Sequence, residues 1–384
     1  MPGRHAVWSR RELLRAGAAS VLVPVIGAAP ATAAAGSERS FRHWTLDNGL
    51  EVVFIPDGRL PLATHSLWYK VGAVDEQLGK SGLAHFFEHA MFKGTTKFPG
   101  DTFKRFVSRY GGSQNAITFL DSTVFYQSMP SQYLGQLMEM EADRMTGLQL
   151  SPAQATLELN AVMEEKRGQE TQDGTLYGQE LMRLRFHGHR LAVPGIGTLE
   201  DLQRLTHDDL MGFYRSHYVP NNAVLVATSD TREDEFRRLV DASYGKLARK
   251  SDLAPRRRQP VPGSPTQTRL VFESVQTAAV EVSRIYTLPG GPQLPQRDAV
   301  ALSLLERLVQ YLGYKSSVWT GLVQTRQIAT SAWAEFARFL SLSQFSLGMR
   351  ANPGVSVEAA EQAFSEAIAA MRADPPDQPT FETV

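Results

Sequence analysis

The run Gly82-Leu83-Ala84-His85-Phe86-Phe87-Glu88-His89-Ala90-Met91-Phe92-Lys93-Gly94-Thr95 is the stretch from which the rest of the chain can be interpreted. Residues three or four positions apart share one face of a helix. If this run is helical, His85, Glu88 and His89 lie on one side, and the two phenylalanines between them turn toward the core. Gly94 stands where such a helix would end. The spacing therefore predicts a short helix that presents two imidazoles and one carboxylate together.

This arrangement of side chains suggests a metal site. Two neutral imidazoles one helical turn apart supply half of a tetrahedral zinc site. Glu88 is placed to take a proton from a metal-bound water. The alternative is a solvated helix face on which two histidines occur by chance, but His-x-x-Glu-His is also the inverted form of a known zinc-peptidase motif. Because two histidines leave the ligand set incomplete, a further ligand must come from elsewhere in the chain.

Composition limits the possible functions. The 384 residues are enough for two domains, and their 42% hydrophobic and 21% charged content is that of an ordinary globular protein. Lys plus Arg and Asp plus Glu number 40 each, so the net charge gives no indication of binding to nucleic acid or acidic lipid. The absence of cysteine excludes thiolate ligands and a cysteine nucleophile, so a metal site must use His and carboxylate.

Residues 1–35 have the layout of a bacterial export signal. Ser9-Arg10-Arg11-Glu12-Leu13-Leu14-Arg15 is a twin-arginine pattern, and Ala31-Thr32-Ala33-Ala34-Ala35 offers an Ala-x-Ala cleavage site after a weakly apolar run. That run is too short and too rich in Ala and Gly to predict a membrane span. We expect a periplasmic or secreted protein exported by the twin-arginine route, with a mature chain from about Gly36. An uncleaved basic leader is the alternative.

Hydrophobic periodicity and turn residues predict alternating strands and helices in two parts. In the first part we expect strands at 44–46, 50–55, 62–69, 114–118, 123–129 and 223–227, and helices at 101–110, from 131, at 152–171, at 176–186 and after 206. A segment at 250–265 rich in Pro, Arg and Lys is interpreted as an exposed linker. After it we expect strands at 280–287, 329–336 and 339–349, and helices at 297–312 and 357–372. The predicted domains are therefore 36–249 and 266–384, the second shorter than the first.

The helix predicted after Ser151-Pro152, a good N-cap followed by proline, is acidic. Glu158 and Glu165 are two turns apart on one face, and Glu164 is rotated by about a quarter turn. Any long surface helix carries solvated acidic residues. Spacing alone does not choose a ligand among Glu158, Glu164, Glu165 and Glu170.

The His-bearing run resembles the metal motif of the pitrilysin/insulinase family of inverted zincins. The similarity is greatest to its small two-domain bacterial peptidases and to the mitochondrial processing peptidase β subunit, and it extends over about residues 41–350. Other family-like runs are Gly111-Gly112 with Asn115-Ala116-Ile117-Thr118, Glu141-Ala142-Asp143-Arg144-Met145 and Tyr218-Val219-Pro220-Asn221-Asn222-Ala223. The resemblance implies an α+β fold of two αβ-roll domains. Each would be a mostly antiparallel sheet with helices on one face, and the second would be incomplete.

The resemblance also implies roles for individual residues. The family's third ligand is a Glu that ends a Glu-x6-Glu pattern, which here corresponds to Glu158 and Glu165. Glu165 would then bind one zinc ion per chain together with His85 and His89. Glu88 would be the general base, and Glu158 would orient one of the metal ligands without binding the metal itself. The strand residues Asn115, Ala116, Ile117 and Thr118 would bind substrate.

The expected function is that of a zinc metalloendopeptidase, which hydrolyses unfolded peptides or processes small polypeptides through a Glu88-activated zinc-bound water. The alternative is a scaffold or chaperone-like subunit of a hetero-oligomer with weak or no activity. An Arg and a Tyr that hold substrate in the family are replaced here by Gln324 and Thr330. We therefore expect a homodimer, or a heterodimer with a second family member that supplies these residues. Neither a nucleic-acid partner nor a membrane span is expected.

Overall fold

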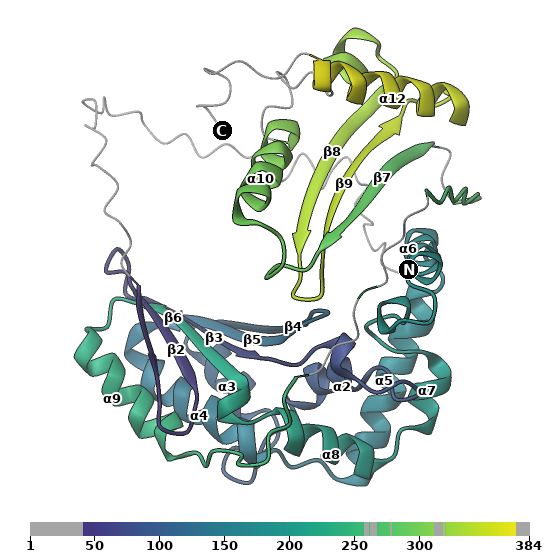
Figure 1. The fold of residues 1–384 in the computed structure, drawn as a ribbon. Helices are drawn as coiled ribbons and strands as arrows, with labels where there is room; N and C mark the ends of the chain where they lie inside the picture. The colour runs from purple at the N-terminus through teal and green to yellow at the C-terminus, as the bar shows by residue number, and fades with distance from the viewer. Residues whose placement is uncertain are drawn as a thin grey trace, which may run out of the picture. The chain divides into compact units, whose positions relative to one another are not determined.

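The computed structural model describes residues 41–256, 261, 267–276, 279–310, 318 and 320–373. The expected export signal lies outside the described residues, as do 257–260 and 262–265 of the expected linker. The described chain forms one six-stranded and one three-stranded sheet, each with helices packed on one face (Figure 1). This mixed α and β architecture without a closed barrel confirms the predicted fold class, whereas the domain boundaries stay predictions.

The first sheet has the strand order β1-β2-β6-β3-β5-β4. Its strands are β1 (Arg42–Thr45), β2 (Glu51–Pro56), β3 (Leu62–Tyr69), β4 (Ser113–Thr118), β5 (Thr123–Pro130) and β6 (Ala223–Ser229). All neighbours pair antiparallel except β2 and β6, which are parallel. The predicted turn joins β1 to β2, where Gly49 has a φ of 88° that favours glycine. β4 is the last strand in this order and so lies at one edge of the sheet.

One face of this sheet is covered by helices. Alternate side chains of the central strands, among them Phe54, Leu67, Phe125 and Leu225, are fully buried in a common core with the helices. The helices are α2 (Leu83–Ala90), α3 (Thr102–Arg109), α4 (Leu134–Gly147), α5 (Pro152–Gln169), α6 (Asp173–Arg185), α7 (Leu199–Arg204), α8 (His207–His217) and α9 (Glu233–Ser243). Short 3-10 turns are η1 (Ala73–Asp75), η2 (Ser131–Tyr133), η3 (Arg190–Ala192), η4 (Pro220–Asn222) and η5 (Tyr244–Lys246).

Several predicted helix ends differ from the structure. α2 ends at Ala90 rather than at Gly94, because the amides of Phe92 and Lys93 bond to carbonyls three residues back and tighten the chain before Gly94. Ser131 opens a 3-10 turn, and the α-helix begins three residues later. Asp101 stands at the N-cap of α3 as expected, but its side chain makes no capping hydrogen bond.

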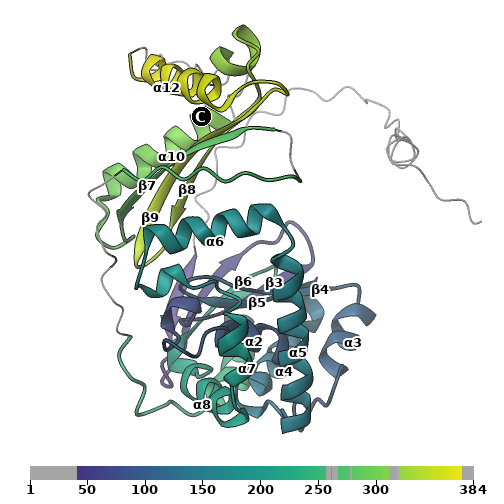
Figure 2. The same ribbon diagram turned by 90° about the vertical axis from the view of Figure 1, so that its right-hand side faces the viewer.

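The second sheet has the order β7-β9-β8, with both pairs antiparallel. Its elements are β7 (Glu281–Pro289), α10 (Gln296–Gln310), a π-helical turn η6 (Thr320–Thr325), β8 (Ala329–Arg338), β9 (Leu342–Ala351) and α12 (Val357–Ala373). Phe345, Leu347 and Met349, on one face of β9, share a buried cluster with Phe364 of α12. Figure 2 shows α10 and α12 over this sheet. Among the described helices, none is long and apolar enough to cross a membrane.

Candidate metal centre

Helix α2 brings His85 and His89 together as the spacing predicts. Their ring centroids are 4.8 Å apart. The intervening Phe86 and Phe87 are fully buried, and Phe87 stacks on Tyr214 of α8 with the ring centroids 5.7 Å apart. Because the two phenylalanines fix one side of α2 in the core, the opposite side carries the partly exposed His85, Glu88 and His89.

Helix α5 packs beside α2 and carries the acidic residues (Figure 1). It begins with a capping box in which Ser151 and Gln154 bond to each other's backbone amides. Val162 is fully buried between the two glutamates that the resemblance singles out. Its burial fixes the rotation of α5, so that the turns on either side of Val162 face α2.

Glu165 faces both histidines. Its Oε2 atom lies 3.8 Å from Nε2 of His85 and 3.4 Å from Nε2 of His89. One potential ligand atom from each of these three residues lies within 4.8 Å of the others, and no other such group of three exists within the part of the chain that the structure describes. Zinc bonds of about 2.1 Å in tetrahedral geometry place ligand atoms roughly 3.4 Å apart. The spacing of the three residues therefore fits a zinc ion.

The other glutamates of α5 point elsewhere or have other partners. Glu164 is 72% exposed and pairs with Arg167, while Glu170 pairs with Lys166 at 3.1 Å. The second oxygen of Glu165 accepts a hydrogen bond of 2.9 Å from Gln169, one turn further along α5. Of the four glutamates that spacing left open, Glu165 is thus the one directed at Nε2 of both imidazoles.

Glu158 contacts the Nδ1 atom of His89. It is 8% exposed, and its Oε1 atom is 3.3 Å from Nδ1 of His89 while Oε2 pairs with Lys93. The hydrogen bond from His89 is the main cause that holds the pKa of Glu158 below its usual value, and it also raises the pKa of His89. An Nδ1–H donated to a carboxylate leaves Nε2 free to bind a metal. Sequence reasoning missed Lys93, although it follows His89 by four residues in the same run.

His85 occupies a different environment. Burial, followed by the charge of His89, lowers the pKa of His85, although Glu88 and Glu165 oppose this. Its Nδ1 atom is buried and has no hydrogen-bond partner within the described part of the chain. A lowered pKa keeps the imidazole neutral, which is the form that binds metal ions.

The predicted substrate-binding residues lie on β4, the edge strand next to α2. Asn115 and Ile117 are exposed on the face away from the helices, and Ala116 is buried on the other face. The hydroxyl of Thr118 is 3.5 Å from the backbone carbonyl of Ala84 in α2. The structure thus places the strand beside α2, which carries His85 and His89, and the role of the strand in substrate binding stays a prediction.

Gln324 and Thr330, which stand where the family has its substrate-holding Arg and Tyr, are both exposed. Gln324 is exposed in η6. Thr330 is exposed near the start of β8, and its hydroxyl donates a hydrogen bond of 3.1 Å to the carbonyl of Arg350. Neither side chain carries a positive charge or a phenol.

Comparison with known proteins identifies two family models. Residues 52–198 match the model described as insulinase, peptidase family M16, and residues 204–384 match the peptidase M16 inactive domain. The zinc protease PqqE of Helicobacter pylori is 28% identical over 323 residues, which cover 83% of this chain and 71% of that protein. The mitochondrial-processing peptidase subunit beta of Blastocladiella emersonii is 27% identical over 225 residues, 59% of this chain and about half (48%) of that subunit.

Solved structures share the fold. The crystal structure of a protease from Helicobacter pylori matches with a TM-score of 0.81 and 24% identity, covering 90% of this chain and 83% of that one. The periplasmic protease PqqL from Escherichia coli matches with a TM-score of 0.76 and 20% identity, covering 90% of this chain and 39% of that one. At such identities the likeness shows the fold alone.

Proposed function

Because this chain belongs to the pitrilysin/insulinase family of peptidases, we propose that it is a zinc-dependent endopeptidase acting on unfolded peptides or small polypeptides. The observation that carries this proposal is the convergence of His85, His89 and Glu165 within 4.8 Å. Glu88 stands on the same face of α2 as the two histidines. Relatives named as zinc proteases support the same chemistry.

The residues have distinct tasks in this proposal. His85, His89 and Glu165 hold one zinc ion, which when bound supplies a Lewis acid that polarises a carbonyl and acidifies water. Glu88 accepts the proton of the attacking water and delivers it to the leaving amine. Glu158 keeps His89 in the Nδ1–H tautomer, and Lys93 balances the charge of Glu158.

The substrate adds to the edge of the first sheet. β4 is an edge strand, so its outer backbone amides and carbonyls can pair with an extended peptide. Asn115 and Ile117 are exposed for side-chain contacts. A peptide must be free of its own secondary structure to pair in this way, which favours unfolded substrates.

A scaffold role is the second candidate. It is favoured by Gln324 and Thr330, which stand where the family has its substrate-holding Arg and Tyr, and by the match of residues 204–384 to a domain described as inactive. The two candidates are reconciled if a homodimer or heterodimer partner supplies the missing side chains. We also propose export to the periplasm, which the description of the relative PqqL as periplasmic supports. The twin-arginine route is proposed from the sequence of residues 9–15 alone.

Metal content and cleavage measured together test the proposal. The mature chain, from about Gly36, is purified with and without Glu88→Gln, and zinc content and cleavage of a quenched peptide library are measured. Glu88→Gln is expected to keep one zinc per chain and lose cleavage, because only the base is removed. His85→Ala should lose the zinc. A wild-type chain that binds no zinc, or cleavage that survives Glu88→Gln, would overturn the proposal.

A further inference from the structure

We propose that Glu76, Arg190 and Asp201 are positioning residues that hold the N-terminus of α2 and thereby set the spacing of the metal ligands. The inference rests on the proposed metal role of α2. Within the described residues, no hydrogen bond or ion pair joins these three side chains to His85, His89 or Glu165, so they act on the site only through α2 and its neighbours.

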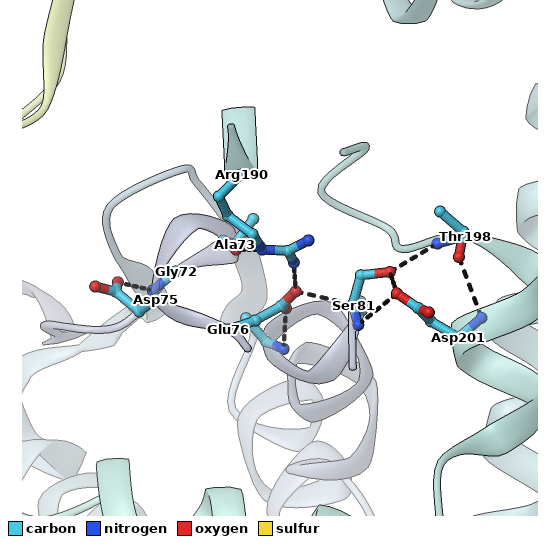
Figure 3. Close-up of polar contacts among 10 residues, drawn as sticks. Gly72, Ala73, Asp75, Glu76, Ser81, Arg190, Thr198 and Asp201 are labelled. Carbon is cyan, nitrogen blue, oxygen red and sulfur yellow. Dashed lines mark hydrogen bonds and ion pairs between the residues drawn. The ribbon is translucent and has the colours of Figure 1, made fainter. Parts of the chain in front are cut away.

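The first turn of α2 has no side-chain cap of its own. The first amides of a helix lack partners inside the helix, and the N-cap here is Gly82, which has no side chain to offer. Glu76 takes over this task from six residues before Gly82. One of its oxygens accepts from the amide of Gly82 at 2.9 Å and the other from the amide of Ala84 at 2.8 Å (Figure 3).

Arg190 pairs with this carboxylate and favours its charged form. Both residues are 6% exposed, and the guanidinium of Arg190 forms an ion pair with Glu76 while its Nε donates to the carbonyl of Ala73 at 3.0 Å (Figure 3). Burial raises the pKa of Glu76 to about 7, and Arg190 is the strongest opposing influence. Without Arg190, burial would therefore favour a protonated Glu76, which would be a poorer acceptor for two amides.

A second carboxylate holds the residue before Gly82. Asp201 of α7 accepts from the amide of Ser81 at 3.0 Å and from its hydroxyl at 2.5 Å. The hydroxyl of Ser81 in turn accepts from the amide of Thr198 at 3.0 Å, as Figure 3 shows. Three amides at the start of α2, those of residues 81, 82 and 84, are thus bound by two carboxylates from other elements.

The backbones also touch at this point. Gly82 and Gly197 both have a φ of 93°, and a Cβ atom on Gly197 would lie 2.9 Å from the Cα atom of Gly82. The segment that leads into α7 is therefore fixed against the start of α2 without an intervening side chain.

Helix α7 connects the two ligand-bearing helices. It packs against α5, which carries Glu165, and its Asp201 holds α2, which carries both histidines. A zinc site tolerates distance errors of only about 0.2 Å, and a helix advances about 1.5 Å per residue. A small displacement of α2 would therefore spoil the ligand geometry while leaving every ligand in place.

The test compares zinc affinity in three variants of the mature chain. Glu76→Gln removes the first anchor, because both of its oxygens accept from amides and a glutamine offers only one acceptor. Asp201→Ala removes the second anchor, because a single oxygen of Asp201 accepts both bonds from Ser81 and an asparagine could still supply it. Phe236→Leu is the matched control: its ring is fully buried and stacks on Phe54 at 4.0 Å, near the opposite end of the sheet from β4. Zinc affinity is measured by competition with a chelator, the ligand field by the absorption spectrum of the Co²⁺ form, and stability by thermal unfolding.

Both anchor variants should lose zinc affinity by about 10-fold or more and should change the Co²⁺ spectrum. Phe236→Leu should lower the unfolding temperature but leave the zinc affinity and the Co²⁺ spectrum unchanged. If Glu76→Gln does not fold because Arg190 is left unpaired, the double variant Glu76→Gln/Arg190→Met replaces it, and Asp201→Ala remains independent. Unchanged affinity and spectrum in the folded anchor variants would overturn this inference alone, provided that His85→Ala still abolishes binding. A wild-type chain without zinc would overturn the proposed function as well.

Discussion

Neighbouring glutamates of α5 give the sharpest comparison at the scale of single residues. Glu165→Ala should lose zinc more severely than the about 10- to 100-fold typical of residues that only orient a ligand, because a donor atom is removed. Glu164→Ala should keep the metal, since Glu164 is 72% exposed and pairs with Arg167. Elemental analysis after dialysis measures the zinc per chain. Loss of zinc in the Glu164 variant with retention in the Glu165 variant would show that the wrong carboxylate had been assigned.

Lys93 offers a second residue-scale prediction. Lys93→Met removes the cation beside Glu158, which leaves a nearly buried carboxylate with less compensation. We expect zinc affinity to fall by roughly tenfold. Lys97→Met is the matched control, because Lys97 is 54% exposed and its ion pair with Glu139 lies in solvent, where such pairs contribute little. Equal zinc affinities in the two variants would contradict a role for Lys93.

Sequence reasoning reached some of these residues and not others. The common face of His85, Glu88 and His89 follows from helical spacing alone. The choice of Glu165 over Glu164 came from family resemblance, because spacing on one helix contains no information about where a second helix lies. The task of Lys93 depends on a carboxylate from α5 and on the tightened chain after Ala90, neither of which a local pattern encodes.

At the scale of elements, the start of α8 predicts a pH-dependent stability. Thr206 and Asp209 cap each other's amides, as their spacing predicted. Lys80 first, and then Thr206, lower the pKa of Asp209 to about 2. Because its pKa is lower in the folded than in the unfolded state, Asp209 stabilises the fold above an unfolded-state pKa of about 3.9. This contribution is lost as the pH falls toward 2.

Asp209→Asn should therefore lower the free energy of unfolding near neutral pH by up to about 1 kcal/mol, because the amide oxygen can still accept from Thr206 but the ion pair with Lys80 is lost. The difference between variant and wild type should shrink between about pH 4 and pH 2. Urea unfolding of both proteins at a series of pH values measures it. A difference that stays constant down to pH 2 would show that the charge of Asp209 is not the cause.

Element ends show where local patterns stop being informative. The capping boxes of α5 and α8 could be predicted because their partners are three residues apart. The caps of α2 could not, because Asp201 is 120 positions from Ser81 and Glu76 acts from a separate turn. A helix capped from a distance looks, in sequence, like a helix with a weak beginning.

For the whole molecule, the fold class was predictable but the strand order was not. Alternating strand and helix patterns predicted the elements of both sheets, including the hairpin of β8 and β9. β6 follows several helices in the chain, yet it inserts between β2 and β3 and makes the one parallel pair found in the described sheets. Such pairing depends on the shape of the assembled core, which local periodicity does not specify.

Export is a property of the whole chain that can be tested directly. Arg10→Lys together with Arg11→Lys should leave the precursor in the cytoplasm if the twin-arginine route is used. Cell fractionation followed by immunoblotting measures the distribution of the protein between cytoplasm and periplasm. The control is the same chain carrying the signal peptide of a protein that uses the general secretory route. Unchanged delivery to the periplasm would remove this route from the proposal.

Activity of the assembled molecule should depend on a second subunit. Gln324 and Thr330 offer neither the charge nor the reach of the Arg and Tyr that the family uses to hold substrate, and the hydroxyl of Thr330 is already bonded to the carbonyl of Arg350. A donor to a developing oxyanion contributes on the order of 3 kcal/mol, so its loss would slow the isolated chain by roughly 100-fold. We therefore expect a gain in kcat/KM of about that size when the partner that supplies these side chains is added.

The assay compares the mature chain alone with the chain plus candidate family members encoded beside it. The stimulated activity must disappear with Glu88→Gln in this chain, which separates catalysis by this metal site from catalysis by a site in the partner. Full activity from a preparation that is strictly monomeric by light scattering would defeat the prediction, because one copy would then supply its own substrate-holding groups. A gain that survives Glu88→Gln would instead assign catalysis to the partner and leave this chain the scaffold role.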